Sequence, residues 1–213
     1  MKSALSLVLA IAVGIISFVS PAMSAVKTCT ALPLDSQFDI AISPTSVDQA
    51  LFDAAVLHFV NIERCAHGLS ALRSDASLQR ATARHSEHMA TNAYLSHKSR
   101  APGMRDLADR LKKARVSYKV AGENIAKSFV FAFYKSPIGG NSATCDFKYA
   151  KSGAKVPVHT YASMAEDLVD MWMDSPSHRK NILYAGFRRA GATANIDASE
   201  YCGTIYAAQN FAN

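Results

Sequence analysis

One acidic residue, Glu123, is a candidate for chemistry because of its neighbours in the sequence. It follows Gly122, precedes Asn124, whose amide can hydrogen bond, and has apolar, strand-like residues on both sides. A half-sheltered carboxylate of this kind can act as a general base or as an acidic partner of a metal site. Its alternative role is structural, in which it accepts hydrogen bonds that hold a loop. The sequence leaves both roles open.

A second segment invites a serine-hydrolase interpretation, because Ser175 and Ser177 precede His178. We reject it, since the chain has no Gly-x-Ser-x-Gly turn of the kind that carries the nucleophile of α/β-hydrolases. Both serines are explained as caps at the start of a helix. Cys-His catalysis needs a free thiol, and the even number of cysteines argues against one.

These segments look like one bipartite signature, formed by residues 122–126 (Gly-Glu-Asn-Ile-Ala) and 172–183. Together with Tyr-Leu-Ser-His at 94–97 and the aromatic tail at 206–211, they resemble the CAP superfamily in its bacterial secreted form. This is the SCP domain of cysteine-rich secretory proteins, insect venom antigens and plant pathogenesis-related proteins. The resemblance extends roughly from Asp48 to the C-terminus and implies an α+β fold, a three-layer α-β-α sandwich with a central antiparallel sheet.

The resemblance also implies a site. In CAP proteins the matching Glu lines a central cleft with a second acid and two histidines. By that resemblance His97 and His178 are the two imidazoles, Glu123 is the first acid, and Asp174 stands where many members carry the second Glu. The sequence departs from the family at Asp174, which is shorter by one methylene, and at Ser177, where the common bacterial form has Gly. We predict that the four residues converge as a catalytic or binding tetrad.

A divalent cation is the cofactor that this tetrad could hold. Two neutral imidazoles, from His97 and His178, with one or two carboxylates nearby suit zinc or magnesium and leave positions open for water. Two histidines alone bind a metal weakly, so we expect modest affinity. His85 lies on the apolar stripe of its helix and is predicted to be a core residue rather than a ligand.

The N-terminal sequence predicts the compartment and the domains. Lys2, an apolar run at 4–19 and the small residues at 21–25 form a secretory signal peptide over residues 1–25. Residues 26–45 are predicted to be an N-terminal arm and 46–213 one domain. No later stretch is long and apolar enough to span a membrane. We therefore expect a secreted, extracellular or periplasmic protein.

Four cysteines lie after the predicted signal peptide. An even number in an oxidising compartment predicts two disulfides. Three connectivities are possible, and we favour Cys29 with Cys65, which ties the arm to the first helix. The second bridge would then join Cys145 to Cys202, tying an inserted loop to a C-terminal strand.

The elements that must position these residues follow from apolar periodicity and from turn residues. The sequence predicts helices from 46 or 48 to 68, after 75, after 103 and over 164–175, and strands over 118–126, 190–196 and 203–211. Residues 136–160 are predicted to be a long loop, pinned by Cys145. Helices and antiparallel strands intermix without a βαβ alternation, which again favours α+β layering.

The net charge of +6 limits the classes of partner. The basic run at 105–115 is explained as a solvated helix face, while weak attraction to an anionic envelope or membrane surface stays open. No nucleic-acid-binding motif is present. The leading hypothesis is a binding module for a lipid or sterol-like ligand or for a host or envelope component. The alternatives are a metal-assisted hydrolase of peptide or envelope substrates, with Glu123 as its base, and a disulfide-braced interaction protein.

Overall fold

The computed structural model describes residues 29, 34–133, 137–199 and 201–213. The predicted signal peptide, residues 1–25, and most of the predicted arm lie outside the described residues. The described part of the arm is packed on the domain, because Phe38 and Ile42 belong to its hydrophobic core. Within the described residues no helix is long and apolar enough to cross a membrane.

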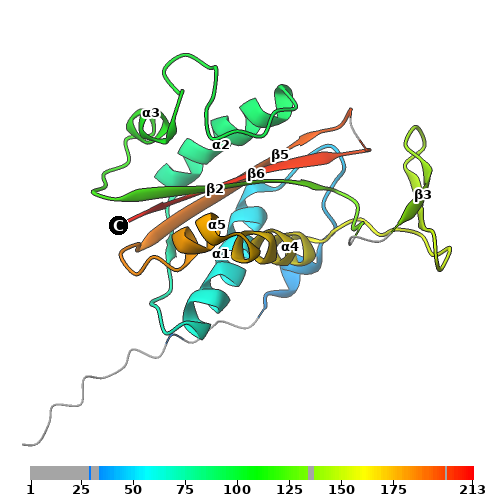
Figure 1. Cartoon of the computed structure of the whole chain (residues 1–213), viewed down its shortest axis with the longest axis horizontal. Coiled ribbons are helices and arrows are strands. Elements are labelled where there is room, and N and C mark those ends of the chain that lie inside the picture. The colour runs from blue at the N-terminus through cyan, green and yellow to red at the C-terminus, as the bar shows by residue number, and fades with distance from the viewer. Residues whose placement is uncertain (1–28, 30–33, 134–136, 200) are drawn as a thin grey trace, which may run out of the picture.

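A central sheet organises the fold (Figure 1). Its strands are β1 (Arg73–Ser74), β2 (Ala121–Phe129), β5 (Arg189–Asp197) and β6 (Thr204–Ala212), in the order β1-β5-β6-β2. The three long strands pair antiparallel, as predicted, and β5 with β6 forms a hairpin. The short β1 pairs parallel with β5, so the described sheet is mixed at this edge.

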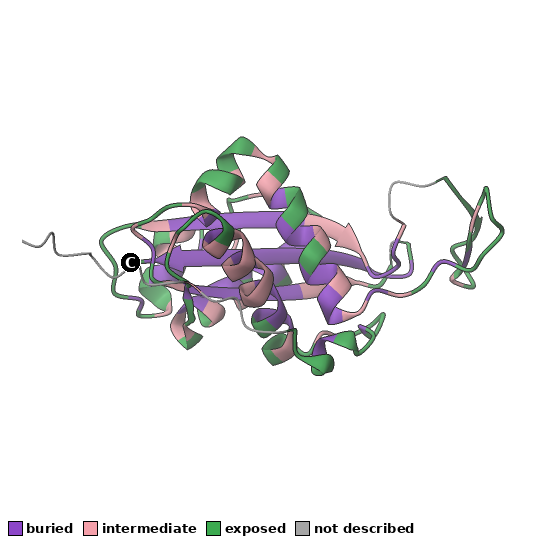
Figure 2. Ribbon diagram, turned by 90° about the horizontal axis from the view of Figure 1, so that it is seen from below, coloured by how far each residue is buried: buried purple, intermediate pink, exposed green. Residues whose placement is uncertain are grey.

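Helices cover both faces of the sheet. On one face lie α1 (Gln49–Ala66), α4 (Tyr161–Asp174) and α5 (Pro176–Ile182), and on the other α2 (Ala76–Thr91) and α3 (Leu107–Lys113). Every residue of β6 is buried, and Figure 2 shows the long strands buried along most of their length. Alternate residues of β6 therefore enter two cores. This is the α-β-α sandwich that the sequence predicted.

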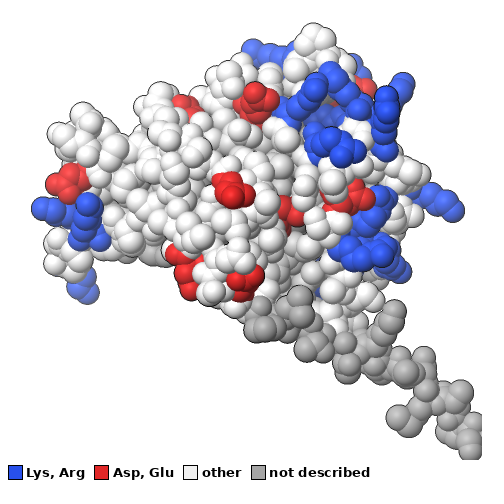
Figure 3. All heavy atoms as spheres, turned by 180° about the vertical axis from the view of Figure 1, so that it is seen from behind, with Lys and Arg blue, Asp and Glu red and all other residues white. Residues whose placement is uncertain are grey.

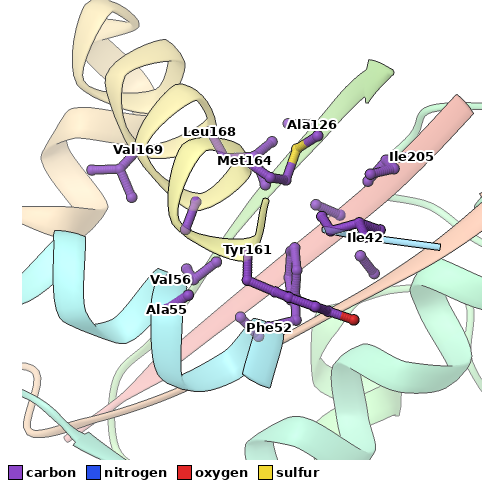
Figure 4. Packing of buried hydrophobic residues seen from close by; sticks show 14 of the residues in the cluster. Ile42, Phe52, Ala55, Val56, Ala126, Tyr161, Met164, Leu168, Val169 and Ile205 are labelled. Atoms are coloured by element: carbon purple, nitrogen blue, oxygen red, sulfur yellow. The ribbon is translucent and has the colours of Figure 1, made fainter. Parts of the chain in front are cut away.

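The larger core lies between the sheet and the helices α1 and α4. Tyr161, Met164 and Leu168 of α4 pack toward Phe52 and Val56 of α1, and all five side chains are buried (Figure 4). Their spacing of three and four residues places them on one face of each helix. Burial of these apolar side chains stabilises the layer by about 25 cal/mol per Å² of surface removed from water.

Polar residues set the helix ends that position the site. Asp48 and Asp75 accept hydrogen bonds from backbone N–H groups in the first turns of α1 and α2, which begin where the sequence predicted helices. Pro176 begins α5, because its missing N–H is not needed in a first turn. Ser175 occupies the cap position, yet its hydroxyl makes no cap bond and lies 3.3 Å from Ser177 Oγ. The predicted side-chain cap at Ser175 was therefore wrong.

The predicted long loop contains a second, two-stranded sheet. Strands β3 (Ile138–Asn141) and β4 (Asp146–Tyr149) form an antiparallel hairpin that extends away from the domain (Figure 1). The sequence prediction missed it because each strand has only four residues. Both predicted disulfides are present, Cys29–Cys65 and Cys145–Cys202, and the second anchors this hairpin.

Candidate functional site

Glu123 lies on β2 and forms a buried ion pair with Arg110 of α3. The Arg110 Nη2 atom donates to both carboxylate oxygens of Glu123, at 2.8 and 2.6 Å. Both residues are almost inaccessible, with Arg110 1% and Glu123 7% exposed. The same guanidinium donates to the carbonyls of Met104 and His97, at 3.3 Å each. Arg110 therefore holds the carboxylate and the loop that carries His97.

The two predicted imidazoles lie together beside this ion pair. His97 Nδ1 is 2.9 Å from Glu123 Oε1, and the His97 side chain is 55% exposed. The ring centroids of His97 and His178 are 6.5 Å apart. The structure thus brings His97, Glu123 and His178 together from a loop, a strand and a helix.

A network of amides fixes α5, and with it His178, against β2. Asn181 donates to the Glu123 carbonyl at 3.1 Å and to Asn124 Oδ1 at 2.8 Å, while Asn124 donates to the His178 carbonyl at 3.3 Å. A Cβ atom at Gly122 would lie 2.8 Å from Asn181 Oδ1. The Gly-Glu-Asn sequence is explained by this close approach and by these hydrogen bonds.

His85 of α2 is a neighbour of Glu123 that the sequence did not assign to the site. Its side chain is fully buried, as predicted for a core residue, but its Nε2 atom lies 3.9 Å from Glu123 Oε1. Neither ring nitrogen has a hydrogen-bond partner among the described residues. Helical periodicity placed His85 on the face toward the sheet, and only the fold shows that Glu123 lies beneath it.

The protonation states follow from burial and from neighbouring charges. Burial raises the pKa of Glu123, but the His97 hydrogen bond and the positive charge of Arg110 outweigh it and hold the pKa below its usual value. Burial lowers the pKa of His85 to about 4. Burial and the nearby His97 lower the pKa of His178. At neutral pH the cluster is a carboxylate paired with a guanidinium, beside a neutral His85.

Asp174 takes a different position from the other three predicted residues. It is the last residue of α4, is exposed, and lines a groove together with Ser128 and Phe129. No hydrogen bond or ion pair joins it to His97, Glu123 or His178 among the described residues. The described contacts therefore join His97 to Glu123 and place its ring beside that of His178, whereas Asp174 lines the groove.

The groove lies between the end of β2 and α4 and encloses about 600 Å³. Most of the surface that lines it is apolar and comes from three phenylalanines and a methionine, while three acidic residues lie along one wall. The described lining residues are Ser128, Phe129, Phe131, Phe133, His159, Asp167, Asp170, Met171 and Asp174. Phe133 packs edge-on against Phe129, with ring centroids 5.2 Å apart, and Tyr201 packs edge-on against the same ring at 5.3 Å. Sequence analysis missed this groove, although the phenylalanines at alternate positions from 129 to 133 were a visible signal.

The residues around His97 fit a metal ion poorly. Two imidazoles with centroids 6.5 Å apart could share an ion with bonds near 2 Å. However, both Glu123 oxygens are engaged by Arg110, whose charge opposes a cation. In the part of the chain that the structure describes, no three His, Cys, Asp or Glu side chains are grouped for a metal. The donor set is two imidazoles, which supports weak binding at most.

Comparisons with known proteins agree with this architecture. The model of the cysteine-rich secretory protein family (CAP) matches residues 57–211. The uncharacterized protein YkwD of Bacillus subtilis is 31% identical over 149 residues, which are 70% of this chain and 44% of that protein. The uncharacterized membrane protein YlbC of the same species is 38% identical over 153 residues, 72% of this chain and 34% of that protein. The chain spans less than half the length of either relative.

Solved structures show the same fold. An extracellular protein containing a SCP domain from Bacillus anthracis has 25% identity and a TM-score of 0.53, covering 78% of this chain and 41% of that one. An outer surface protein from Borrelia burgdorferi has a TM-score of 0.52 and covers 78% of this chain and 96% of that one. At 13% identity, the second likeness concerns the fold alone.

Proposed function

Because the chain belongs to the cysteine-rich secretory protein (CAP) family, we propose that it is a secreted binding module for an apolar, lipid- or sterol-like ligand. The observation that carries this proposal is the aromatic groove of about 600 Å³ between β2 and α4. Secretion is supported by the two disulfides and by the likeness to a SCP-domain protein described as extracellular.

The groove has the size and surface of a small-ligand site. Sites for small molecules usually enclose about 300–1,000 Å³ and are lined mainly by apolar and aromatic side chains. Met171 and Tyr201, which lie at the groove and against its Phe129 wall, are 43% and 49% exposed. A ligand gains about 0.8 kcal/mol for each methylene that it buries there. A chain of eight to ten carbons is therefore enough for measurable binding.

The alternative of a metal-assisted hydrolase receives less support. A general base works best when its pKa is close to the working pH. Glu123 has a lowered pKa, and Arg110 occupies both of its oxygens. The donor set for a metal is limited to His97 and His178. These features favour Glu123 as a structural residue that anchors α3 and the His97 loop on the sheet.

Calorimetric titration with decyl maltoside, a neutral amphiphile with a ten-carbon chain, tests the proposal. The ligand is kept below the concentration at which it forms micelles. The variant Met171→Gln removes apolar surface from the groove, and Leu95→Gln is the matched control, because the two side chains are 43% and 42% exposed. We expect Met171→Gln to weaken binding about fivefold, which corresponds to about 1 kcal/mol, and Leu95→Gln to leave it unchanged.

The outcomes separate the three functional hypotheses. Absence of binding by the wild-type protein would contradict the groove proposal and favour an interaction protein that uses the hairpin β3–β4. A loss in Leu95→Gln and not in Met171→Gln would move the site toward the loop of His97. Turnover of a peptide or envelope substrate that is lost in Glu123→Gln would support the hydrolase.

A further inference from the structure

The wall of the groove formed by α4 carries a stripe of carboxylates. Asp167, Asp170, Met171 and Asp174 are separated by three, one and three residues, so they lie along one face of the helix. Like charges three and four residues apart destabilise a helix slightly. The stripe is therefore not explained by the stability of α4.

The position of the stripe along α4 is also unfavourable for the helix itself. The C-terminal end of a helix carries partial negative charge and favours basic side chains. The last turn of α4 contains no basic residue, and Asp174 is its final residue. Carboxylates at positions where they do not stabilise the helix, on the wall of an apolar groove, indicate a role in binding.

The negative charge of this wall is local and contrasts with the rest of the chain. The net charge of the sequence is +6, and Figure 3 shows a large group of Lys and Arg side chains at one end of the molecule and a smaller group at the opposite end, on the face drawn. No Lys or Arg is among the described residues that line the groove. Asp170 and Asp174 are exposed and form no ion pair within the described part of the chain.

His159 does not neutralise this wall. Its Nε2 atom lies 3.4 Å from Asp167 Oδ2, but burial lowers the pKa of His159 to about 4. The imidazole is therefore uncharged at neutral pH and does not compensate the charges of Asp170 and Asp174. The ammonium of Lys127, on β2, lies 5.7 Å from the centroid of the Tyr206 ring and does not line the groove.

The opposite wall supplies aromatic faces. The rings of Phe129, Phe133 and Tyr201 are close and edge-to-face, with centroids 5.2 and 5.3 Å apart. An aromatic face attracts an ammonium group, and a carboxylate nearby adds a separate Coulomb attraction. Aromatic rings on one side and carboxylates on the other form an environment for a positively charged head group joined to an apolar tail.

We infer that the groove prefers amphiphiles with an amine or quaternary ammonium head group over neutral or anionic ones. The inference rests on the proposed function, since the groove must first bind an apolar ligand. Its volume of about 600 Å³ suits one small amphiphile rather than a folded partner. The carboxylates are exposed and partly screened by water, so we expect a preference of about tenfold over the neutral ligand.

Three ligands with equal ten-carbon chains test this selectivity: decyltrimethylammonium, decyl maltoside and decanoate. Each is titrated by calorimetry below its micelle-forming concentration. The wild-type protein should bind the ammonium ligand about tenfold more tightly than the maltoside, and decanoate most weakly. High salt should reduce the preference, because it depends on charge.

Two double variants assign the preference to the groove. Asp170→Asn with Asp174→Asn removes two charges from the wall, and Asp39→Asn with Glu87→Gln removes two charges from exposed positions elsewhere. The first variant should lose most of the preference for the ammonium ligand, although Asp167 and the aromatic rings remain, and the second should keep the tenfold preference. An equal loss in both variants would contradict the inference, because the effect would then come from net charge.

The remaining outcomes distinguish this inference from the proposed function. Equal binding of the three ligands by the wild-type protein would overturn the charge preference and leave the apolar site intact. Binding of none of them would overturn both.

Discussion

Loss of the Arg110–Glu123 ion pair should cost a large part of the stability of the domain. The pair is almost fully enclosed, with side-chain exposures of 0% and 4%. Removal of one partner of a buried ion pair typically costs about 3–5 kcal/mol, because the other charge is left without compensation. In Arg110→Met, His97 still donates to Glu123, so we expect the lower end, about 3 kcal/mol.

The double variant carries the sharper expectation. Glu123→Gln leaves Arg110 buried without a counter-charge and should cost a similar amount to Arg110→Met. In Arg110→Met with Glu123→Gln no charge remains buried at this position. The combined loss should therefore be smaller than the sum of the two single losses, by about 2 kcal/mol. The effect of Arg110→Met should also decrease as pH is lowered, because a protonated Glu123 needs no partner.

Equilibrium unfolding in urea measures these quantities. The single tryptophan, Trp172, is fully buried, and its indole donates to the Ile125 carbonyl at 3.1 Å, so its fluorescence reports loss of the core. Disulfides are kept oxidised throughout. A loss below about 1 kcal/mol in Arg110→Met, or additive losses in the double variant, would refute a structural ion pair. Glu123 would then be free for other chemistry.

Three further predictions concern the buried histidines, zinc and Gly122. Folding holds His85 and His159 uncharged, with pKa values of about 4, whereas the unfolded chain binds protons near pH 6.5. The unfolding free energy should therefore decrease as the pH is lowered from 7 to 4, by at most about 1.4 kcal/mol per pH unit for each histidine. A flat profile would contradict this. Zinc binding, measured by calorimetry, should be weak and should decrease toward pH 6. It should disappear in the double variant His97→Ala with His178→Ala, and unchanged binding in that variant would place the metal elsewhere. Gly122→Ala should lower the melting temperature, because the new Cβ displaces the Asn181 amide at a cost of about 1–3 kcal/mol, and an unchanged value would show that the amide network adapts.

Features with a local cause could be predicted from the sequence. Asp48 and Asp75 cap their helices through hydrogen bonds within three residues, so local sequence was sufficient. The disulfide Cys145–Cys202 was predicted from the even number of cysteines, which indicates two bridges, and from the position of Cys145 in an inserted loop. The pairing of β5 with β6 followed from the turn-like residues that separate the two predicted strands.

Features that depend on tertiary packing could not be predicted in the same way. Arg110 has the appearance of an ordinary charged helix residue, and only the fold places its guanidinium against Glu123. Asp174 was assigned to the tetrad by resemblance, but its place at the end of α4 directs it to the groove. The groove itself forms where Phe129 and Phe133 meet α4, two segments that are separated by the hairpin insertion.

Mapping of NMR chemical shifts with decyl maltoside tests the central claim most directly, because it identifies the ligand site without a variant. The ligand is added to isotope-labelled, oxidised protein. If the groove is the site, the largest changes will occur at residues 128–133 and 167–174, while the amides of His97 and His178 stay within the experimental error. Changes centred on His97, Glu123 and His178, with none along α4, would contradict binding in the groove and would indicate that the ligand binds at the histidine cluster.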